Sequence, residues 1–351
     1  LFKNMNLDFK KNKKILITGA TGSIGSSLVF RLIESRCKVL RVMSNDENGL
    51  YELSRTIIKK FTIDYDLFIN QMGKNRIRFF LGDVRDKKRC DEITKDVDIV
   101  IHAAAIKHVN IAEYNSAEAL KTNYYGTKNI FKASIKNDVS KFIFISTDKV
   151  VSPTNIMGKS KLLAENFVIN SKKLIGSKKL KVSSIRFGNV VGSRGSVIPN
   201  FISSLNKKQN IFVTSKKMTR FVMTVEDSVN SILSVLNIMK GYEIFILKSM
   251  KCFKIIDLAN ALLLYYKKKG NKKSKIIISE EGKGEKFEEE LFQTKDIPKI
   301  TIKKKMFVIK NKIINNNANY IDKINSYRVS NFNFMSQKQI IKMLKNLSLL
   351  S

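Results

Sequence analysis

An acid and a base are adjacent at Asp148 and Lys149, one residue after a mainly apolar run from Lys141 to Ser146. Two such groups can change each other's pKa, and together they can remove a proton from one atom and donate one to another. Met157 and Lys161 follow, and their spacing predicts one face of a helix. Because an Asp-Lys pair after a strand is often only a solvated turn, its meaning depends on the elements around it.

A glycine-rich stretch has the spacing of a dinucleotide-binding loop. Its glycines recur at every third position after one apolar run and before an amphipathic stretch. The first glycine permits a tight turn, the second lets the backbone approach a pyrophosphate, and the third permits close packing of helix on sheet. Free N–H groups and the helix dipole would hold the negative charge. The cofactor-binding residues expected here, for NAD or NADP, are Gly19, Thr21, Gly22, Ser23, Ile24 and Gly25.

The next strand end bears on the choice of cofactor. Asp46 lies about 20 residues beyond the glycine loop, where an acid contacts the adenosine ribose, and it favours NAD. Ser44 and Asn45, together with a nearby Arg41 or Arg55, leave NADP open. The sequence therefore predicts a nicotinamide dinucleotide without choosing between the two.

Two later strand ends complete the expected cofactor site. Asp83, followed by Val84, is placed to accept a hydrogen bond from the adenine amine. Ala103 and Ala104 are small enough to let the cofactor lie close to the backbone.

Short β-branched runs alternate with amphipathic stretches over the first 190 or so residues, which predicts an α/β doubly wound parallel-sheet Rossmann domain. The strands are expected at Lys14 to Thr18, Lys38 to Met43, Ile77 to Gly82, Ile99 to His102, Lys141 to Ser146 and Val182 to Phe187. The helices between them are expected at Ser23 to Ser35, Ala117 to Asn137 and Asn155 to Leu174.

After about Gly188 the elements become shorter and mixed, which predicts a smaller mixed α/β C-terminal substrate domain. Its elements are expected at Ile198 to Leu205, Glu226 to Met239, Ile255 to Lys267 and Ser336 to Leu350. Two Lys- and Asn-rich stretches, 267–275 and 303–317, are expected to be surface loops or edge strands. The predicted domains are thus 1–187 and 188–351, with segments that can interleave.

The chain is strongly basic: its 351 residues include 65 Lys and Arg against 30 Asp and Glu, a net charge of +35. The excess is mainly Lys and accompanies Asn-rich stretches such as 315–317, whereas a nucleic-acid surface concentrates Arg and aromatic residues on one element. We therefore expect diffuse solvated charge and no specific nucleic-acid partner.

Cysteine and histidine usage argues against a disulfide scaffold and against a metal site. The three cysteines, Cys37, Cys90 and Cys252, are scattered, and His102 and His108 lack metal-ligand partners at usable spacing. His102 is interpreted as a hydrogen-bonded core residue. This usage fits a reducing, cytoplasmic setting.

No apolar run is long enough to span a membrane, and the N-terminus lacks the pattern of a signal peptide. The chain begins with Leu1, so either Met5 is the true start or upstream sequence, for instance a membrane anchor, precedes it.

The motifs together resemble the extended short-chain dehydrogenase/reductase superfamily, whose catalytic set is Ser or Thr at a strand end and Tyr-x-x-x-Lys on the next helix. More narrowly, the chain is similar to the UDP-N-acetylglucosamine 4,6-dehydratases of bacterial surface-glycan biosynthesis, from about Lys14 to Leu344. The motifs that carry this resemblance are HAAAIKHV (102–109), EYN (113–115), KTN (121–123), STDK (146–149), RFGNVVGSRGSVIP (186–199), MTRF (218–221) and GEK (284–286).

The resemblance implies a reaction in which C4 of the sugar is oxidised by the nicotinamide, water leaves across C5 and C6, and the hydride returns to C6. It thus implies a tightly bound NAD or NADP that is regenerated in each turnover. It implies that Lys149 takes the C5 proton and that Asp148 protonates the departing hydroxyl. Lys161 would hold the nicotinamide ribose. Met157 occupies the usual Tyr position and cannot accept the C4 proton, so Asp148, Lys149 or a water held by Thr147 would take it.

The resemblance also implies substrate contacts, with a UDP-N-acetylhexosamine bound mainly by residues 188–351. Arg194 or Arg220 would bind the UDP phosphates, because a guanidinium donates in pairs to a diphosphate. Glu285 would reach the uridine ribose, and Lys107 would lie near both substrate and cofactor. The substrate-binding candidates are Lys107, Asn189, Arg194, Ser196, Arg220 and Glu285.

The sequence departs from the family where Gly282 and Lys283 replace the usual Arg-Pro, and where Asn110 replaces a Pro. Two other activities stay open: a nucleotide-sugar 4-epimerase and a non-catalytic NAD(P)-binding protein. A homo-oligomer is also expected.

Overall fold

The structure is a computed structural model that describes residues 12–35, 37–61, 76–279, 284–303, 305–314, 317–325 and 333–350. Gly282 and Lys283, where the sequence departs from the family, lie outside these ranges. Asn315 and Asn316 of the Asn-rich tract also lie outside them. The chain divides into two compact units that interleave in sequence. The first comprises Leu1–Thr147, Ile156–Arg186 and Glu226–Phe245, and the second comprises Asp148–Asn155, Phe187–Val225 and Ile246–Ser351.

The first unit is built around a sheet whose strands follow the order β10-β6-β5-β4-β1-β2-β3. The central β1 pairs in parallel with β2 on one side and with β4 on the other. Chain order therefore reverses direction beside β1, which is the point where α/β sheets of this kind bind ligands. The strands are β1 (Lys14–Thr18), β2 (Val39–Ser44), β3 (Ile77–Leu81), β4 (Ile99–His102), β5 (Lys141–Thr147), β6 (Lys181–Phe187) and β10 (Glu243–Leu247).

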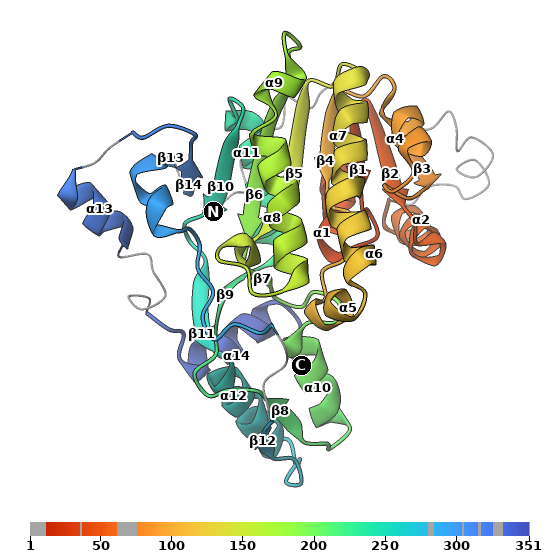
Figure 1. The fold of residues 1–351 in the computed structure, drawn as a ribbon. Coiled ribbons are helices and arrows are strands. Elements are labelled where there is room, and N and C mark those ends of the chain that lie inside the picture. Colours follow the sequence, from red (N-terminus) through yellow and green to blue (C-terminus); the bar gives the residue numbers. More distant parts are fainter. Residues whose placement is uncertain are drawn as a thin grey trace. The chain divides into compact units, whose positions relative to one another are not determined.

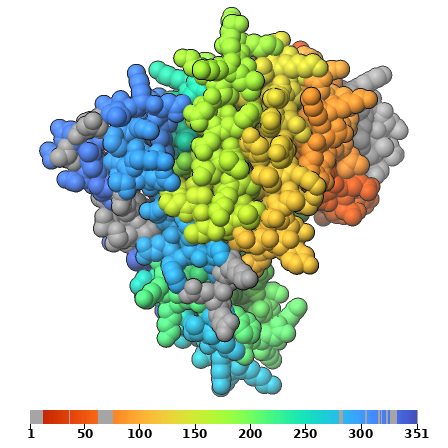
Figure 2. All heavy atoms as spheres, viewed as in Figure 1, coloured from red at the N-terminus to blue at the C-terminus, as the bar shows by residue number. Residues whose placement is uncertain are grey.

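Helices cover both faces of this sheet: α7 and α8 lie in front of it in Figure 1, and α1 and α11 lie behind. In Figure 2, side chains of α7 and α8 lie next to one another over the front face. The helices are α1 (Ser23–Glu34), α2 (Glu47–Phe61), α4 (Lys87–Thr94), α5 (Val109–Tyr114), α6 (Ser116–Leu120), α7 (Thr127–Lys136), α8 (Ile156–Ile169), α9 (Lys172–Ile175) and α11 (Val225–Ile238).

The predicted fold class is confirmed, and each predicted strand is present with ends that differ by at most a residue or two. The helix expected from Ala117 to Asn137 is present as α6, a π-helical turn η2 (Lys121–Gly126) and α7. Apolar periodicity does not distinguish a π-helical turn from an α-helical one, so the sequence predicted a single helix.

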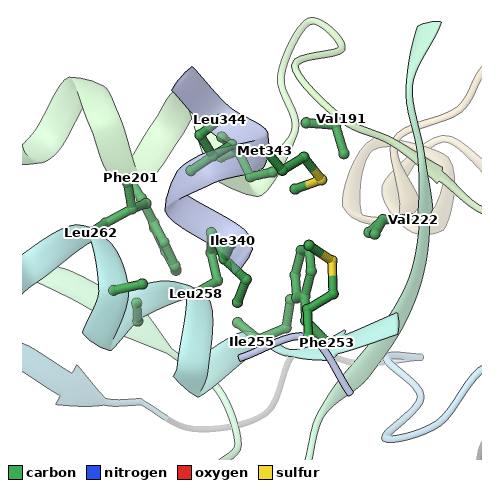
Figure 3. Close-up of a cluster of buried hydrophobic side chains, with 14 of the residues drawn as sticks. Val191, Phe201, Val222, Phe253, Ile255, Leu258, Leu262, Ile340, Met343 and Leu344 are labelled. Carbon is green, nitrogen blue, oxygen red and sulfur yellow. The ribbon is translucent and has the colours of Figure 1, made fainter. Parts of the chain in front are cut away.

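The second unit has its own core, shown in Figure 3, where α10, α12 and α14 contribute apolar side chains that cluster with Phe253 and Val222. Two small sheets have the strand orders β11-β9-β7 and β12-β8, and β13 and β14 form an antiparallel pair. The strands are β7 (Asn189–Val190), β8 (Ile211–Val213), β9 (Thr219–Met223), β11 (Lys251–Lys254), β12 (Ile276–Ile278), β13 (Ile300–Lys303) and β14 (Met306–Ile309). The helices are η3 (Asp148–Val150), α10 (Val197–Asn206), α12 (Ile255–Lys268), η4 (Thr294–Lys299), α13 (Ala318–Asn325) and α14 (Gln337–Asn346).

One expectation for the Lys-rich stretches was wrong in part. The stretch from 303 to 317 was expected at the surface, yet β14 within it is buried along its whole length. Composition averaged over the stretch hid the short apolar run from Met306 to Ile309.

Candidate functional site

The glycine loop connects β1 to the N-terminus of α1. Gly19 has φ of +65°, and a Cβ there would lie 2.6 Å from the Ala104 nitrogen. Gly22 is the N-cap of α1 and offers no side chain to the helix, whose first turn has no acidic residue. A loop with these features, next to an uncompensated helix N-terminus, fits the pyrophosphate of a dinucleotide.

The loop after β4 packs directly against the glycine loop. Ala103 N donates to Thr18 O at 3.1 Å, and Ala104 N lies 3.4 Å from Thr18 Oγ1. The predicted cofactor residues of β1 and β4 are therefore brought together at the point where chain order reverses.

The strand end at β2 contacts the same loop. The hydroxyls of Ser44 and Thr21 lie 2.9 Å apart, and Ser44 Oγ accepts from Asp46 N at 3.2 Å. Asp46 also caps α2, because its Oδ1 accepts from Gly49 N at 2.9 Å. Arg41 is buried and donates to Ile93 O at 2.6 Å, so its guanidinium has a structural role that the sequence did not indicate.

At the end of β3, Asp83 forms an ion pair with Arg85. Its carboxylate accepts from Arg85 Nη2 at 2.7 Å and from Arg85 Nε at 2.9 Å, while Val84 beside it is buried. Burial raises the pKa of Asp83, but hydrogen bonds from Arg85 and its charge outweigh burial and lower that pKa overall. Asp83 is thus a carboxylate that accepts hydrogen bonds within the chain from Arg85, and its contact with an adenine amine stays a prediction.

His102 lies in the core of the first unit. One ring nitrogen is 2.6 Å from Thr18 Oγ1 and the other is 2.9 Å from Thr127 Oγ1. The interpretation of His102 as a hydrogen-bonded core residue is confirmed. Burial, with a contribution from Lys161, lowers its pKa to about 3, so the ring is neutral.

Lys161 is buried on α8, with 6% of its surface exposed. Its Nζ donates to Ile145 O at 2.5 Å and lies 4.1 Å from the centre of the Phe144 ring. Burial lowers the pKa of Lys161 to about 7, against an opposing effect of the Glu165 carboxylate one turn away. An amine poised near neutrality can hold or release a proton at working pH.

Met157 occupies an apolar site one turn before Lys161. It is 4% exposed and packs with Ala112 and Ala119. Glu113 fixes the start of the helix, because its Oε1 accepts from Ile156 N at 2.6 Å. Met157 therefore packs as a core residue.

Asp148 and Lys149 follow β5 in the short helix η3. Asp148 is 1% exposed and Lys149 is 19% exposed along their side chains, and Asp148 Oδ1 lies 3.0 Å from Lys149 Nζ. Asn189, a predicted substrate residue on β7, also accepts from Lys149 Nζ at 3.1 Å. The structure thus brings together three of the predicted residues.

One residue at this cluster was missed. Glu289 is buried, and its Oε1 lies 3.3 Å from Lys149 Nζ. It belongs to a run of three acidic residues, 288–290, and nothing in the sequence distinguishes the buried member from its exposed neighbours. Burial lowers the pKa of Lys149, but Asp148 and Glu289 outweigh burial and raise that pKa overall, so Lys149 is an ammonium.

The other predicted substrate residues are distributed around the second unit. Arg220 is buried on β9, and its Nη1 donates to Thr219 O at 2.7 Å and to Lys286 O at 2.9 Å. Ser196 is the N-cap of α10, with a buried hydroxyl that has no hydrogen-bond partner among the described residues. Arg194 and Glu285 are exposed. In the first unit, Lys107 is exposed and Thr147 is half-buried at the end of β5.

A doubly wound sheet, a glycine loop after β1, and a lysine on the helix that follows the β5 strand end define the class of extended short-chain dehydrogenase/reductase folds. A family model described as polysaccharide biosynthesis protein matches residues 15–311. The chain belongs to this polysaccharide biosynthesis protein family.

Individual relatives cover most of the chain. An uncharacterized membrane protein of Methanocaldococcus jannaschii is 39% identical over 346 residues, 98% of each chain. A UDP-N-acetylglucosamine 4,6-dehydratase (inverting) of Campylobacter jejuni is 40% identical over 252 residues, 71% of each. A UDP-glucose 4-epimerase of Rickettsia canadensis is 36% identical over 292 residues, 82% of this chain and 80% of that one.

Among solved structures, Pen from Bacillus thuringiensis matches with a TM-score of 0.85 and 34% identity, over 98% of this chain and 100% of that chain. Although one relative is named a membrane protein, no helix within the described residues has the length and apolar character needed to cross a bilayer.

Proposed function

We propose that the protein is a nucleotide-sugar 4,6-dehydratase that converts UDP-N-acetylglucosamine to a UDP-4-keto-6-deoxy-N-acetylhexosamine for surface-glycan biosynthesis. The observation that carries the proposal is the Asp148-Lys149 pair, in which a buried carboxylate and a partly buried ammonium lie 3.0 Å apart. Elimination of water needs a base and an acid near neighbouring carbon atoms, and this pair supplies both groups.

The protons follow from the state of the pair. Lys149 is an ammonium at rest, so it can act as a base at C5 only after passing a proton to a neighbouring carboxylate. If that carboxylate is Asp148, one transfer produces an amine for C5 and a carboxylic acid for the departing C6 hydroxyl. The same transfer leaves the summed charge of the two groups unchanged.

A bound nicotinamide would accept the C4 hydride and return it to C6. The chain would hold this cofactor, NAD or NADP, with the glycine loop, Ser44 and Asp46, and would hold its ribose with Lys161. The low pKa of Lys161 fits a second task, since a neutral amine there could take the C4 proton that Met157 cannot accept. The substrate diphosphate is assigned to Arg194 or Arg220, and the adjoining sugar to Asn189 and Ser196.

The epimerase alternative has one specific observation in its favour, the relative named UDP-glucose 4-epimerase. A 4-epimerase needs proton and hydride transfer at C4 alone, and it has no step that uses an acid-base pair at C5 and C6. Met157, packed among apolar residues, also removes the tyrosine on which such an enzyme would rely.

The experiment is incubation of the purified protein with UDP-N-acetylglucosamine and no added nucleotide, followed by mass spectrometry and NMR. The proposal expects loss of one water from the sugar nucleotide. An isomer of unchanged mass would support the epimerase, and unchanged substrate in the presence of bound cofactor would reject both enzymes.

Lys149→Ala separates an enzyme from a non-catalytic binding protein. We expect kcat to fall about 10² to 10⁴-fold because the proposed base is lost. Lys172→Ala, which removes an exposed lysine of α9, is the matched control and should leave kcat unchanged.

Cytoplasmic location and homo-oligomerisation remain predictions, to be checked by fractionation and by light scattering.

A further inference from the structure

Glu289 lies against the Lys149 ammonium with only part of its hydrogen-bonding capacity used. Its side chain is 3% exposed, and Oε1 is 3.3 Å from Lys149 Nζ. The second oxygen, Oε2, has no hydrogen-bond partner among the described residues. Burial of a carboxylate costs free energy, which the Lys149 ammonium offsets, and a buried oxygen without a donor calls for an explanation.

The chain holds Glu289 in place through a frame of backbone contacts within the second unit. Gly284 O accepts from the side chains of Thr154 and Asn155, at 2.9 and 3.0 Å. Lys286 Nζ donates to Val151 O at 2.6 Å. These contacts tie the stretch before Glu289 to the residues that directly follow Lys149.

A second set of contacts ties the same stretch to β9. Phe287 O accepts from Thr219 N at 2.8 Å, and Lys286 O accepts from Arg220 Nη1 at 2.9 Å. The position of Glu289 is therefore set from two sides, by the segment after Lys149 and by β9.

We propose that Glu289 is a positioning residue that fixes Lys149 beside Asp148, so that one proton is shared by an amine and two carboxylates. The proposal rests on the dehydratase function and deepens it, because it adds a third group to the pair that performs the elimination.

The charges explain what the third group contributes. With Lys149 protonated, Asp148, Lys149 and Glu289 sum to −1. Transfer of the proton breaks an N–H bond of Lys149 and forms an O–H bond on a carboxylate, and the sum stays −1. The neutral amine and neutral acid are easier to bury than the ion pair, while the remaining carboxylate still attracts the proton on Lys149 when the amine takes one from C5.

Other groups face Lys149 as well. Arg220 acts against the two carboxylates by lowering the pKa of Lys149, and Asn189 accepts a hydrogen bond without adding charge. Removal of the Glu289 charge should therefore let Arg220 and burial shift Lys149 toward the neutral amine.

The test uses Glu289→Gln, which keeps the size of the side chain and removes its charge. Its matched control is Glu288→Gln, the same change at the exposed neighbouring position. Of the two protonation states of a lysine side chain, only the neutral amine reacts with acetic anhydride. The rate of acetylation of Lys149, followed by peptide mass spectrometry, therefore reports the neutral fraction of Lys149.

We expect acetylation of Lys149 near pH 8 to be about 10-fold faster in Glu289→Gln, since a fall of one pKa unit raises the neutral fraction tenfold. Glu288→Gln should match the unmodified protein. Glu289→Asp keeps the charge and should restore slow acetylation, which a merely structural role would not require. Equal acetylation of Lys149 in Glu289→Gln and the unmodified protein, both folded by circular dichroism, would overturn the proposal.

Turnover provides an independent measurement. In Glu289→Gln, the limb of the kcat-against-pH profile that reports Lys149 should move to lower pH by about one unit, with the KM for UDP-N-acetylglucosamine unchanged. If the unmodified protein eliminates no water, the dehydratase function fails, and acetylation still decides whether Glu289 controls Lys149.

Discussion

Glu165 and Arg186 form an ion pair in the interior of the first unit, with Arg186 Nη2 2.6 Å from Glu165 Oε1 and side chains 8% and 0% exposed. Ser184 Oγ donates to the other carboxylate oxygen at 3.0 Å. Lys161 lies one helical turn before Glu165, and the negative charge of Glu165 acts to raise the pKa of Lys161. The carboxylate of Glu165 therefore supports both the packing of the sheet against α8 and the charge state of Lys161.

Glu165→Gln should destabilise the fold strongly, because it leaves Arg186 buried without its carboxylate. Loss of one partner of a buried ion pair costs about 3 to 5 kcal/mol. The measurement is the free energy of unfolding in urea. Ser184→Ala is the control, since it removes one hydrogen bond and no charge and should cost about 1 kcal/mol. Equal losses in the two variants would show that the charge of Glu165 is unimportant.

Stability should depend on pH through Lys161. Its pKa is about 7 in the folded protein against 10.5 for an ordinary lysine. Between these values the unfolded chain holds the proton and the folded chain does not, so the free energy of unfolding rises with pH by about 1.4 kcal/mol per unit from this group. Below pH 7 the destabilisation caused by burying the Lys161 ammonium is fully present, and above pH 10.5 this destabilisation vanishes.

Urea unfolding of Lys161→Met between pH 7 and 10 measures this dependence. The difference between unmodified protein and variant should change steadily in favour of the unmodified protein as pH rises. Lys159→Met, at an exposed position on the same helix, should show no such trend. A flat difference for Lys161→Met would contradict the low pKa.

Only one of the two histidines should titrate in the usual range. His102 is buried between two threonine hydroxyls, and its pKa is about 3, because burial disfavours the cation. His108 is exposed, although burial and Lys107 lower its pKa somewhat. In NMR spectra recorded from pH 4.5 to 8, one imidazole signal should shift, and His108→Gln should remove it. Two shifting signals would show that His102 is open to solvent.

The sequence predicted those parts of the site that depend on local chemistry. The glycine loop, the Asp148-Lys149 pair and the spacing of Met157 and Lys161 each lie within one turn or one helix, so their spacing indicates their geometry. The sheet followed from the alternation of apolar runs, because parallel strands need crossover helices.

Contacts between segments that are distant in the sequence could not be predicted. Glu289 reaches Lys149 only because an irregular stretch is tied to Val151 and β9, and irregular stretches have no periodicity to read. The sequence left Arg41 as a candidate for binding a 2′-phosphate, but its guanidinium is buried and donates to Ile93 O. The sequence could not exclude this candidate, because only the fold shows which face of β2 the side chain occupies. The low pKa of Lys161 likewise depends on burial, which charge counting does not show.

The glycines of the cofactor loop should separate folding from binding. A Cβ at position 25 would overlap the Gly19 carbonyl oxygen and lie 2.8 Å from the Ala20 Cα, so Gly25→Ala should cost about 1 to 3 kcal/mol of stability. Gly22 has an ordinary backbone conformation, and among the described residues a Cβ there would meet only Gly19 O, in a tight contact at 3.3 Å without overlap. Gly22→Ala should therefore fold nearly normally.

The same methyl at position 22 would stand at the N-terminus of α1, where the pyrophosphate is expected, and should weaken binding of NADH about 10-fold or more. Because the chain has no tryptophan, NADH fluorescence can be titrated without energy transfer from an indole. Gly25→Ala should lose stability in urea, whereas Gly22→Ala should lose affinity at nearly unchanged stability. If Gly22→Ala bound NADH as tightly as the unmodified protein, the loop would not approach the cofactor, and the assignment of this helix N-terminus to the pyrophosphate would fail.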